Sequence, residues 1–375
     1  MTIVAVPRVL FLHFFLLILL HMSSSSENKN TTMTGKRGRG FTVVNNTLPE
    51  KHKEQIQSNI TVLLVPLVCL LAFLIGLPAN LLALWVLLFR TNKLPSTILL
   101  INLTFCDLLL LLVLPFRIVY HFSGNNWTFG EPLCRIVIGL FYGNMYGSVV
   151  CLALIAVDRY VALVHPFGAK ILRSKKNSVL MSVLVWIVIT AAALPLLVSK
   201  QSYQIKNLHI ITCHDALPPE EQQKYFLPYF VTLFSLCFLL PLLVVLFCYG
   251  AVLHTLLAEG QRYAHAVRVT VLMLVVFVVC LLPSNVLLLL HYSKSDFVNN
   301  HLYIPYLISL SFSTFNSCID PFIFYYVSED FRKRVPKALS CSGSDSDSSS
   351  ETSRSKSTLL LKLSRTEGPL NGGAC

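Results

Sequence analysis

The sequence predicts an all-α membrane protein, a seven-transmembrane helix bundle with a short cytoplasmic amphipathic eighth helix. Hydrophobic residues make up 54% of the chain and charged residues only 13%, whereas soluble domains carry about 25% charged residues. Seven apolar segments are each long enough to cross a bilayer, which takes about 20 residues. A charged pair, Asp158–Arg159, lies inside one long apolar segment, although charges at membrane depth are costly unless they serve a purpose.

The seven apolar segments are expected to be helical, because lipid requires the backbone to satisfy its own hydrogen bonds. We expect spans at Ile60–Phe89, Thr97–Phe122, Cys134–Val164, Val179–Val198, Tyr225–Leu257, Ala264–Tyr292 and Leu302–Val327. The chain then divides into a signal peptide (1–22), an extracellular tail (23–59), the seven-helix bundle (60–327) and a cytoplasmic segment (328–375) with the amphipathic helix and a Ser-rich tail.

An eighth apolar run, Val9–Leu20, is too short to span and lies between Arg8 and a run of serines, as in a secretory signal peptide. A signal anchor is the alternative. The amino terminus is then extracellular and the carboxyl terminus cytoplasmic, and the Lys and Arg residues of the predicted inner loops agree with this orientation. The net charge of +12 therefore reflects topology, and a nucleic-acid partner is not expected.

Four Asn-x-Thr sequons fall on the predicted outer side, where N-glycosylation occurs. They are Asn30, Asn45, Asn59 and Asn126. A fifth, at Asn102, lies inside the second predicted span and should be unmodified.

Two of the eleven cysteines are predicted to lie outside the cell. Cys134 opens the third span and Cys213 lies in the second outer loop, so the oxidising compartment favours a disulfide between them. Cys341 follows the basic amphipathic segment Ser328–Leu339 and is a candidate for palmitoylation. An unmodified tail thiol is the alternative.

One motif falls in each predicted span, in a fixed order. The motifs are Asn80 in GLPAN, Asp107 in NLTFCD, Asp158-Arg159-Tyr160, Trp186, Pro241 with Tyr249, Phe277 with Cys280 and Pro283, and Asp320-Pro321. This set resembles the rhodopsin-like G-protein-coupled receptors. The resemblance implies that Asp158, Arg159 and Tyr160 end the third helix at the cytoplasmic face and form, with Asp320 and Pro321, the activation switch.

Asp107 and Asp320 would place two carboxylates inside the bundle, where like charges need a cation or a proton between them. With Ser148 and Asn316, the resemblance implies a sodium pocket that stabilises the resting state. A protonated, hydrogen-bonded aspartate is the alternative. No other metal or cofactor is expected.

Two positions depart from the family pattern. Leu281 stands one residue after Cys280, where the family usually has an aromatic residue, and Phe324 replaces the tyrosine of the seventh-helix motif. Phe324 cannot make the water-bridged contact to Tyr249 that the family pattern implies. Activation is therefore expected to be less efficient or to use other contacts.

Four further stretches narrow the family. They are HFSGNNWTFGEPLC (121–134), GLFYGNMYGS (139–148), TCHDALPPE (212–220) and FNSCIDPF (315–322). Together they resemble the protease-activated receptors, with a pattern similar to that of the trypsin-responsive member.

The resemblance gives a role to the basic cluster 35–39 in the polar outer tail, which is expected to be disordered. Cleavage between Arg39 and Gly40, by an extracellular trypsin-like serine protease rather than thrombin, would expose a tethered ligand. That ligand is Gly40, Phe41, Thr42, Val43, Val44 and Asn45. About 20 residues separate Gly40 from the first predicted helix, which gives a reach of roughly 25 Å and an effective concentration on the order of millimolar.

The new ammonium group and Phe41 need an acidic, aromatic receptor surface. Asp215, beside His214, is the expected anion. Upper helix positions that match the family's peptide-contacting region are Tyr142, His291, Tyr292, Tyr303 and Tyr306. Packing at the membrane interface explains any one of these tyrosines, but the group facing one vestibule favours ligand binding.

The resemblance also implies partners inside the cell. We expect heterotrimeric G proteins, Gq with Gi or the Rho-activating class as additions, and arrestin, which would bind phosphorylated serines in Ser340–Ser357. The protein is expected at the plasma membrane as a multi-pass receptor in the lipid bilayer.

Other functions have less support in the sequence. The basic cluster could be only a processing site, which would leave a receptor for a diffusible peptide. A nucleotide receptor would need basic residues high in the sixth and seventh spans, yet no Lys or Arg lies between Leu302 and Val327. An enzyme is not expected, because the chain shows neither a Gly-x-Gly-Asp pair nor metal-ligand spacing.

Overall fold

The structure is a computed structural model that describes residues 47–48, 50–91, 95–165, 174–217, 225–258, 264–292, 302–327 and 331. All of these lie within one compact unit. Seven helices in this part of the chain are long and apolar enough to cross a membrane. They are Lys53–Phe89, Ser96–Phe122, Glu131–Val164, Lys176–Val198, Leu227–Ala258, Val267–Leu290 and Tyr303–Tyr325. The seven predicted spans are confirmed.

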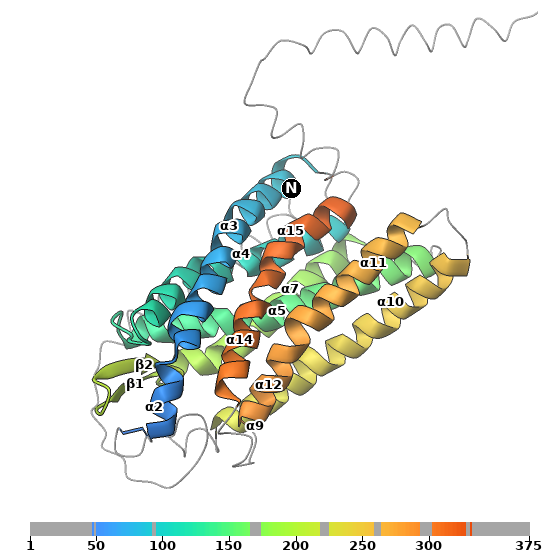
Figure 1. The fold of residues 1–375 in the computed structure, drawn as a ribbon. Coiled ribbons are helices and arrows are strands. Elements are labelled where there is room, and N and C mark those ends of the chain that lie inside the picture. Colours follow the sequence, from blue (N-terminus) through green and yellow to red (C-terminus); the bar gives the residue numbers. More distant parts are fainter. Residues whose placement is uncertain are drawn as a thin grey trace, which may run out of the picture. The chain divides into compact units, whose positions relative to one another are not determined.

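The spans are built from α-helices and short π-helical turns, and Figure 1 shows them packed side by side. In chain order the helices are α2 (Glu50–Ile56), η1 (Ile60–Leu64), α3 (Val65–Phe89), α4 (Pro95–Phe122), α5 (Glu131–Val164), α7 (Lys175–Val198), α9 (Leu227–Leu233), η3 (Phe234–Leu239), α10 (Leu240–Ala258), α11 (Ala264–Val276), η5 (Phe277–Leu281), α12 (Leu282–Tyr292), α14 (Tyr303–Ser313) and α15 (Phe315–Val327). A hairpin of β1 (Ser202–Ile205) and β2 (Ile210–Cys213) joins the fourth and fifth spans.

Helix α5 is buried along most of its length and packs against α4, α7 and α10. Glycine allows α7 to approach closely, since a Cβ at Gly147 would lie 2.5 Å from the Cγ1 of Ile189. Small residues at helix contacts are a common means of close packing in lipid. The third span therefore forms the core against which the functional residues are arranged.

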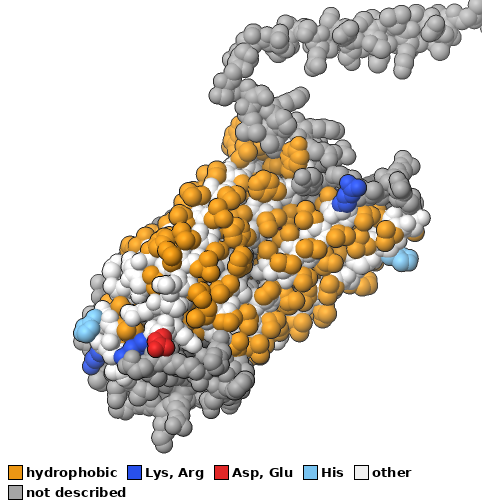
Figure 2. All heavy atoms as spheres, viewed as in Figure 1, with side chains coloured by type: hydrophobic (Ala, Val, Ile, Leu, Met, Phe, Trp, Pro, Cys, Tyr) orange, Lys and Arg blue, Asp and Glu red, His pale blue; other side chains and the backbone are white. Residues whose placement is uncertain are grey.

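Polar side chains inside the helices find partners on neighbouring helices. Asn102 of α4 donates to the Ser182 hydroxyl of α7 at 2.8 Å and accepts from the Trp186 indole at 3.1 Å. Asn102 is fully buried, so its sequon is inaccessible in the folded protein. The outward-facing surface is instead apolar, as the hydrophobic side chains in Figure 2 show.

The outer tail is partly ordered. Residues 50–56 form α2, and Ile56 and Leu48 are both buried. The expectation of disorder through residue 59 is therefore wrong for this stretch, because its two apolar side chains are buried in the folded protein. The polar composition around them concealed that contact.

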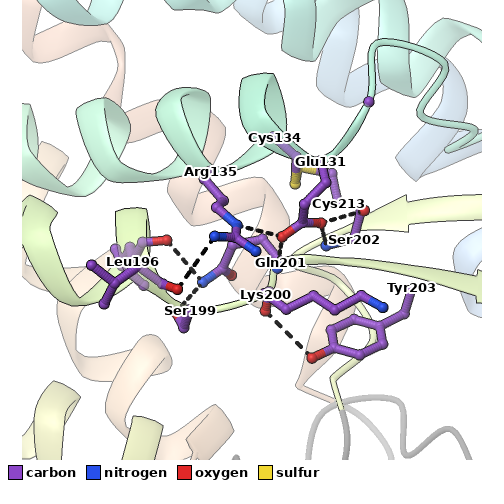
Figure 3. A network of polar contacts seen from close by, with 12 residues as sticks. Glu131, Cys134, Arg135, Leu196, Ser199, Lys200, Gln201, Ser202, Tyr203 and Cys213 are labelled. Atoms are coloured by element: carbon purple, nitrogen blue, oxygen red, sulfur yellow. Dashed lines mark hydrogen bonds and ion pairs between the residues drawn. A yellow bond between two sulfur atoms is a disulfide. The ribbon is translucent and has the colours of Figure 1, made fainter. Parts of the chain in front are cut away.

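The β1–β2 hairpin is fixed to the outer end of α5 at two places (Figure 3). The predicted disulfide between Cys134 and Cys213 is present, with a Cα–Cα distance of 5.8 Å. Beside it, Glu131 accepts from the backbone N–H groups of Gln201 and Ser202 at 2.8 and 2.7 Å and from the Arg135 Nε at 2.6 Å. The Ser202 hydroxyl also donates to Glu131. A covalent bond and a charged hydrogen-bond cluster thus hold the second outer loop.

We expect Cys134→Ser or Cys213→Ser to reduce surface expression strongly, because loss of a structural disulfide costs about 2–5 kcal/mol. Glu131→Gln should destabilise the receptor by about 1–3 kcal/mol, because one carboxylate oxygen becomes an NH₂ group facing donors. Surface labelling of intact cells measures the expression, and thermal unfolding of detergent-solubilised receptor measures the stability. Gln204→Ala, on the exposed edge of β1, is the control. Unchanged melting of Glu131→Gln would show that the cluster does not hold the loop.

Candidate functional site

The outer vestibule brings together residues from four parts of the chain. Asp215 follows β2 directly, and its Oδ2 accepts from the Tyr120 hydroxyl of α4 at 2.5 Å. Tyr303, at the start of α14, interacts with the same carboxylate. Because the disulfide holds Cys213 two residues away, the position of this carboxylate is set by the loop anchor described above.

A hydrogen-bonded chain runs beside Asp215. The hydroxyls of Tyr142 and Tyr306 lie 2.6 Å apart, and Tyr142 reaches the His214 Nε2 at 3.4 Å. The Nδ1 of His214 lies 2.7 Å from the Gln201 Oε1, which fixes the ring. Four predicted contact residues, Tyr142, His214, Tyr303 and Tyr306, thus lie close to the predicted anion.

The charge of Asp215 depends on its surroundings. Burial raises the pKa of its carboxyl above the usual aspartate range, while the Tyr120 hydrogen bond and the nearby Arg117 charge act in the opposite direction. Arg117 itself lies over the Phe141 ring, 4.4 Å from the centroid. The vestibule therefore presents a half-buried anion among phenol groups, an arrangement suited to an ammonium group followed by an aromatic residue.

Three residues of this site were not predicted from the sequence: Tyr120, Gln201 and Arg117. Tyr120 and Arg117 lie near the end of an apolar segment, where interface residues are common. Gln201 lies in a loop, where polar residues are the rule. Tyr120 and Arg117 act on Asp215, and Gln201 contacts the neighbouring His214. Only the tertiary structure brings these partners together.

The predicted sodium-pocket residues also lie together, on α4, α5 and α15. The Asn316 amide donates to the Asp320 Oδ2 at 3.2 Å. Asp107 lies near Ser148 and Asp320, yet neither of its carboxylate oxygens has a hydrogen bond of good geometry. The Asn316 Oδ1 and the Asp320 Oδ1 are likewise buried without a partner.

Of these residues, Asn316 lines a cavity of about 10 Å³, together with Asn144, Ser148 and Ser317. This volume is close to the space that one water molecule needs. Leu281, the departure from the family pattern, lines the same cavity. Unpaired buried oxygens are costly, and their convergence fits a small hard cation, which binds carboxylate, amide and hydroxyl oxygens. Asn144 and Ser317 were not predicted, because isolated small polar residues in helices carry no distinct signal.

At the carboxyl-terminal end of α5, which is predicted to be cytoplasmic, Asp158 is buried and the Tyr160 hydroxyl lies 2.9 Å from the His165 Nε2. Phe324 is buried and its ring meets Phe331 edge to face. Tyr249 donates to the Met273 sulfur at 3.3 Å. Phe324 therefore takes part in apolar packing. Pro321 lies within α15, and the switching role of these residues stays a prediction.

Several predicted sites fall outside the described residues. These are the signal peptide (1–22), the cleavage site and ligand at Arg39–Asn45, the sequons at Asn30 and Asn45, nearly all of the predicted eighth helix, Cys341 and the Ser-rich tail. His291 and Tyr292 end α12, but their side chains are also outside the described part. Asn59 is exposed and Asn126 is half-exposed; their glycosylation remains a prediction.

Comparison with known proteins extends these observations. Residues 79–324 match the family "7 transmembrane receptor (rhodopsin family)". The chain is 47% identical to human proteinase-activated receptor 4 over 293 residues, covering 78% of this chain and 76% of that protein. It is 40% identical to human proteinase-activated receptor 3 (73% and 74% covered) and to mouse proteinase-activated receptor 2 (76% and 73% covered). The predicted similarity to the trypsin-responsive member in particular stays a prediction.

The seven spans, the disulfide-anchored outer loop and these matches agree over most of the described chain. The protein is therefore a receptor of the plasma membrane and not an enzyme, and it belongs to the proteinase-activated receptors within the rhodopsin family of seven-transmembrane receptors.

Proposed function

We propose that this receptor is switched on when a trypsin-like serine protease cuts its extracellular tail between Arg39 and Gly40. The new amino terminus, beginning Gly40-Phe41, then binds in the outer vestibule of the same molecule. The observation that supports this best is the Asp215 carboxylate, which interacts with Tyr120 and Tyr303 and lies next to His214, the partner of Tyr142. An α-ammonium group, with a pKa of about 7.7–8.0, is largely protonated at physiological pH and matches that anion.

The proposed cut after Arg39 is favoured by the product it leaves. Cleavage after Lys36 or Arg37 would leave Arg39 near the front of the ligand, where its charge suits an apolar vestibule poorly. Cleavage after Arg39 gives a small first residue, an aromatic second and an uncharged apolar run. Residues 45–56 mix Glu50 and Glu54 with basic residues and lack the acidic-aromatic stretch that favours thrombin.

Inside the cell, the proposal includes coupling to heterotrimeric G proteins, with Gq first and Gi or the Rho-activating class as additions. Arrestin would bind the phosphorylated serines of Ser340–Ser357. This requires an extracellular amino terminus and a cytoplasmic carboxyl terminus, as the loop charges indicate.

The proposal also includes a sodium ion in the resting receptor. Asp107, Ser148, Asn316 and Asp320 would hold it. Oxygens of Asp107, Asn316 and Asp320 are buried without a hydrogen bond of good geometry, and Ser148 and Asn316 line the small cavity. A bound sodium ion supplies positive charge between the two carboxylates. The chain's own contribution is to hold α4, α5 and α15 around that charge.

We expect Arg39→Ala to abolish the calcium response to trypsin while the free peptide GFTVVN still activates the receptor. Arg37→Ala, two positions away, is the matched control and should respond normally. Calcium imaging of expressing cells measures both. If Arg37→Ala abolishes the response and Arg39→Ala does not, the cleavage site is wrong. If neither matters and free GFTVVN still activates, the receptor responds to a diffusible peptide.

We expect binding of labelled GFTVVN to membranes to follow a bell-shaped pH profile. Asp215 must be ionised, and burial raises its pKa, so affinity should already fall at a pH above the usual aspartate range. On the alkaline side, affinity should fall as the peptide amine loses its proton near pH 8. Asp215→Asn should lower affinity about tenfold or more and remove the acid limb only.

Tyr120→Phe is the companion variant for this profile. It removes the hydroxyl that stabilises the ionised carboxylate but keeps the ring, so the acid limb should move to higher pH. An acid limb that persists in Asp215→Asn would show that another group receives the amine.

We expect Asp107→Asn to remove the sodium dependence of agonist binding. In the unaltered receptor, replacing N-methylglucamine chloride with sodium chloride should weaken binding of GFTVVN, because the ion favours the resting arrangement. Asp107→Asn removes one of the two charges that hold the ion. Equal sodium sensitivity in both receptors would place the ion elsewhere or exclude it.

A further inference from the structure

The last residues of the outer tail are docked on the extracellular loops at two points. At the first, Leu48 pairs with the side chain of Asn207 in the hairpin turn: its N–H donates to the Asn207 Oδ1 at 3.2 Å, and its carbonyl accepts from the Asn207 Nδ2 at 2.8 Å. The Leu48 side chain is only 4% exposed. One amide side chain thus satisfies both backbone groups of a buried residue, as a neighbouring β-strand would.

The second point lies at the end of α2. The Ile56 carbonyl accepts from the Asn125 Nδ2 at 2.5 Å, and the Ile56 side chain is fully buried. Asn125 also contacts the His121 Nδ1 at 2.6 Å. His121 is next to Tyr120, which holds Asp215, so this anchor connects directly to the vestibule.

We propose that Asn207 and Asn125 are positioning residues that shorten the tether of the activating ligand, an inference that rests on the proposed function. With the tail free up to the first span, about 20 residues would connect Gly40 to its anchor, whereas Leu48 lies only eight positions after Gly40. Where the span from anchor to vestibule is no longer than the r.m.s. length of the eight-residue tether, effective concentration falls roughly as the −3/2 power of tether length, so docking raises it about fourfold.

The shorter tether is still long enough. Asp215 lies eight positions after Asn207, and eight extended residues span at most about 27 Å. Leu48 likewise lies eight positions after Gly40, so the ligand can reach back over the same length. The docked tail therefore limits where the new amino terminus can search without placing the vestibule out of reach.

The test compares tethered and free ligand on the same receptor. Phe41→Ala weakens the tethered ligand, so that full cleavage gives less than the maximal response. The uncleavable Arg39→Ala form is then titrated with free GATVVN peptide. The peptide concentration that gives the same response as full cleavage is the effective concentration of the tethered ligand. Asn207→Ala/Asn125→Gly removes both polar anchors; glycine suits the φ of 58° at Asn125. Gln204→Ala, on the same hairpin, is the matched control.

We expect the double variant to lower the matched concentration about fourfold, with the free-peptide dose–response unmoved and Gln204→Ala unchanged. The proposal is overturned if the matched concentration is the same in the double variant. This outcome includes a disturbed vestibule, in which the response to cleavage and the response to free peptide are weakened together. If neither trypsin nor free GFTVVN activates the unaltered receptor, the proposed function itself fails.

A length insertion provides a second, independent measurement. About 12 Gly and Ser residues inserted between Asn46 and Thr47 should lower the matched concentration about fourfold in the otherwise unaltered tail, but only about twofold in the double variant, whose tether is already long. An equal effect in both chains would show that Leu48 and Ile56 do not anchor the tail, and would overturn the proposal.

Discussion

Lipid offers no hydrogen-bond partner, and this constraint determines most of the structure. It requires helical backbone in the seven spans and brings polar side chains together across helices, as Asn102 meets Ser182 and Trp186. Some buried polar atoms inside the bundle lack such a hydrogen bond, and their positions are informative. Both oxygens of Asp107 and one each of Asn316 and Asp320 are buried without a hydrogen bond of good geometry, and these are the oxygens that we propose would hold a sodium ion.

Outside the spans, where water is available, a disulfide and a cluster of hydrogen bonds fix the structure. The Cys134–Cys213 bond and the Glu131 cluster hold the hairpin on α5. The rest of the vestibule follows from that attachment, because Asp215 lies two residues beyond the disulfide and meets Tyr120 of α4. The same hairpin carries Asn207, which holds Leu48 of the tail. One loop therefore positions both the proposed receiving site, Asp215, and the proposed anchor of the tether, Asn207.

The sequence predicted features whose signal lies in composition or spacing. Long apolar runs predicted the spans, and two cysteines outside the membrane predicted the disulfide. Four of the vestibule side chains were found because their positions match a family pattern. Tyr120 and Asn207 were missed because their importance arises from a partner distant in sequence. The docked tail was missed for a related reason: Leu48 and Ile56 are isolated apolar residues in a polar stretch, and only tertiary contact buries them.

The central claim is that signalling follows from one new amino terminus. Labelling of free α-amines on intact cells during trypsin treatment, followed by mass spectrometry of the receptor, tests this most directly. The account predicts that a receptor chain beginning at Gly40 appears with the same time course as G-protein activation. Signalling that precedes any chain beginning at Gly40, or that accompanies only chains beginning at Arg37 or Gly38, would contradict it.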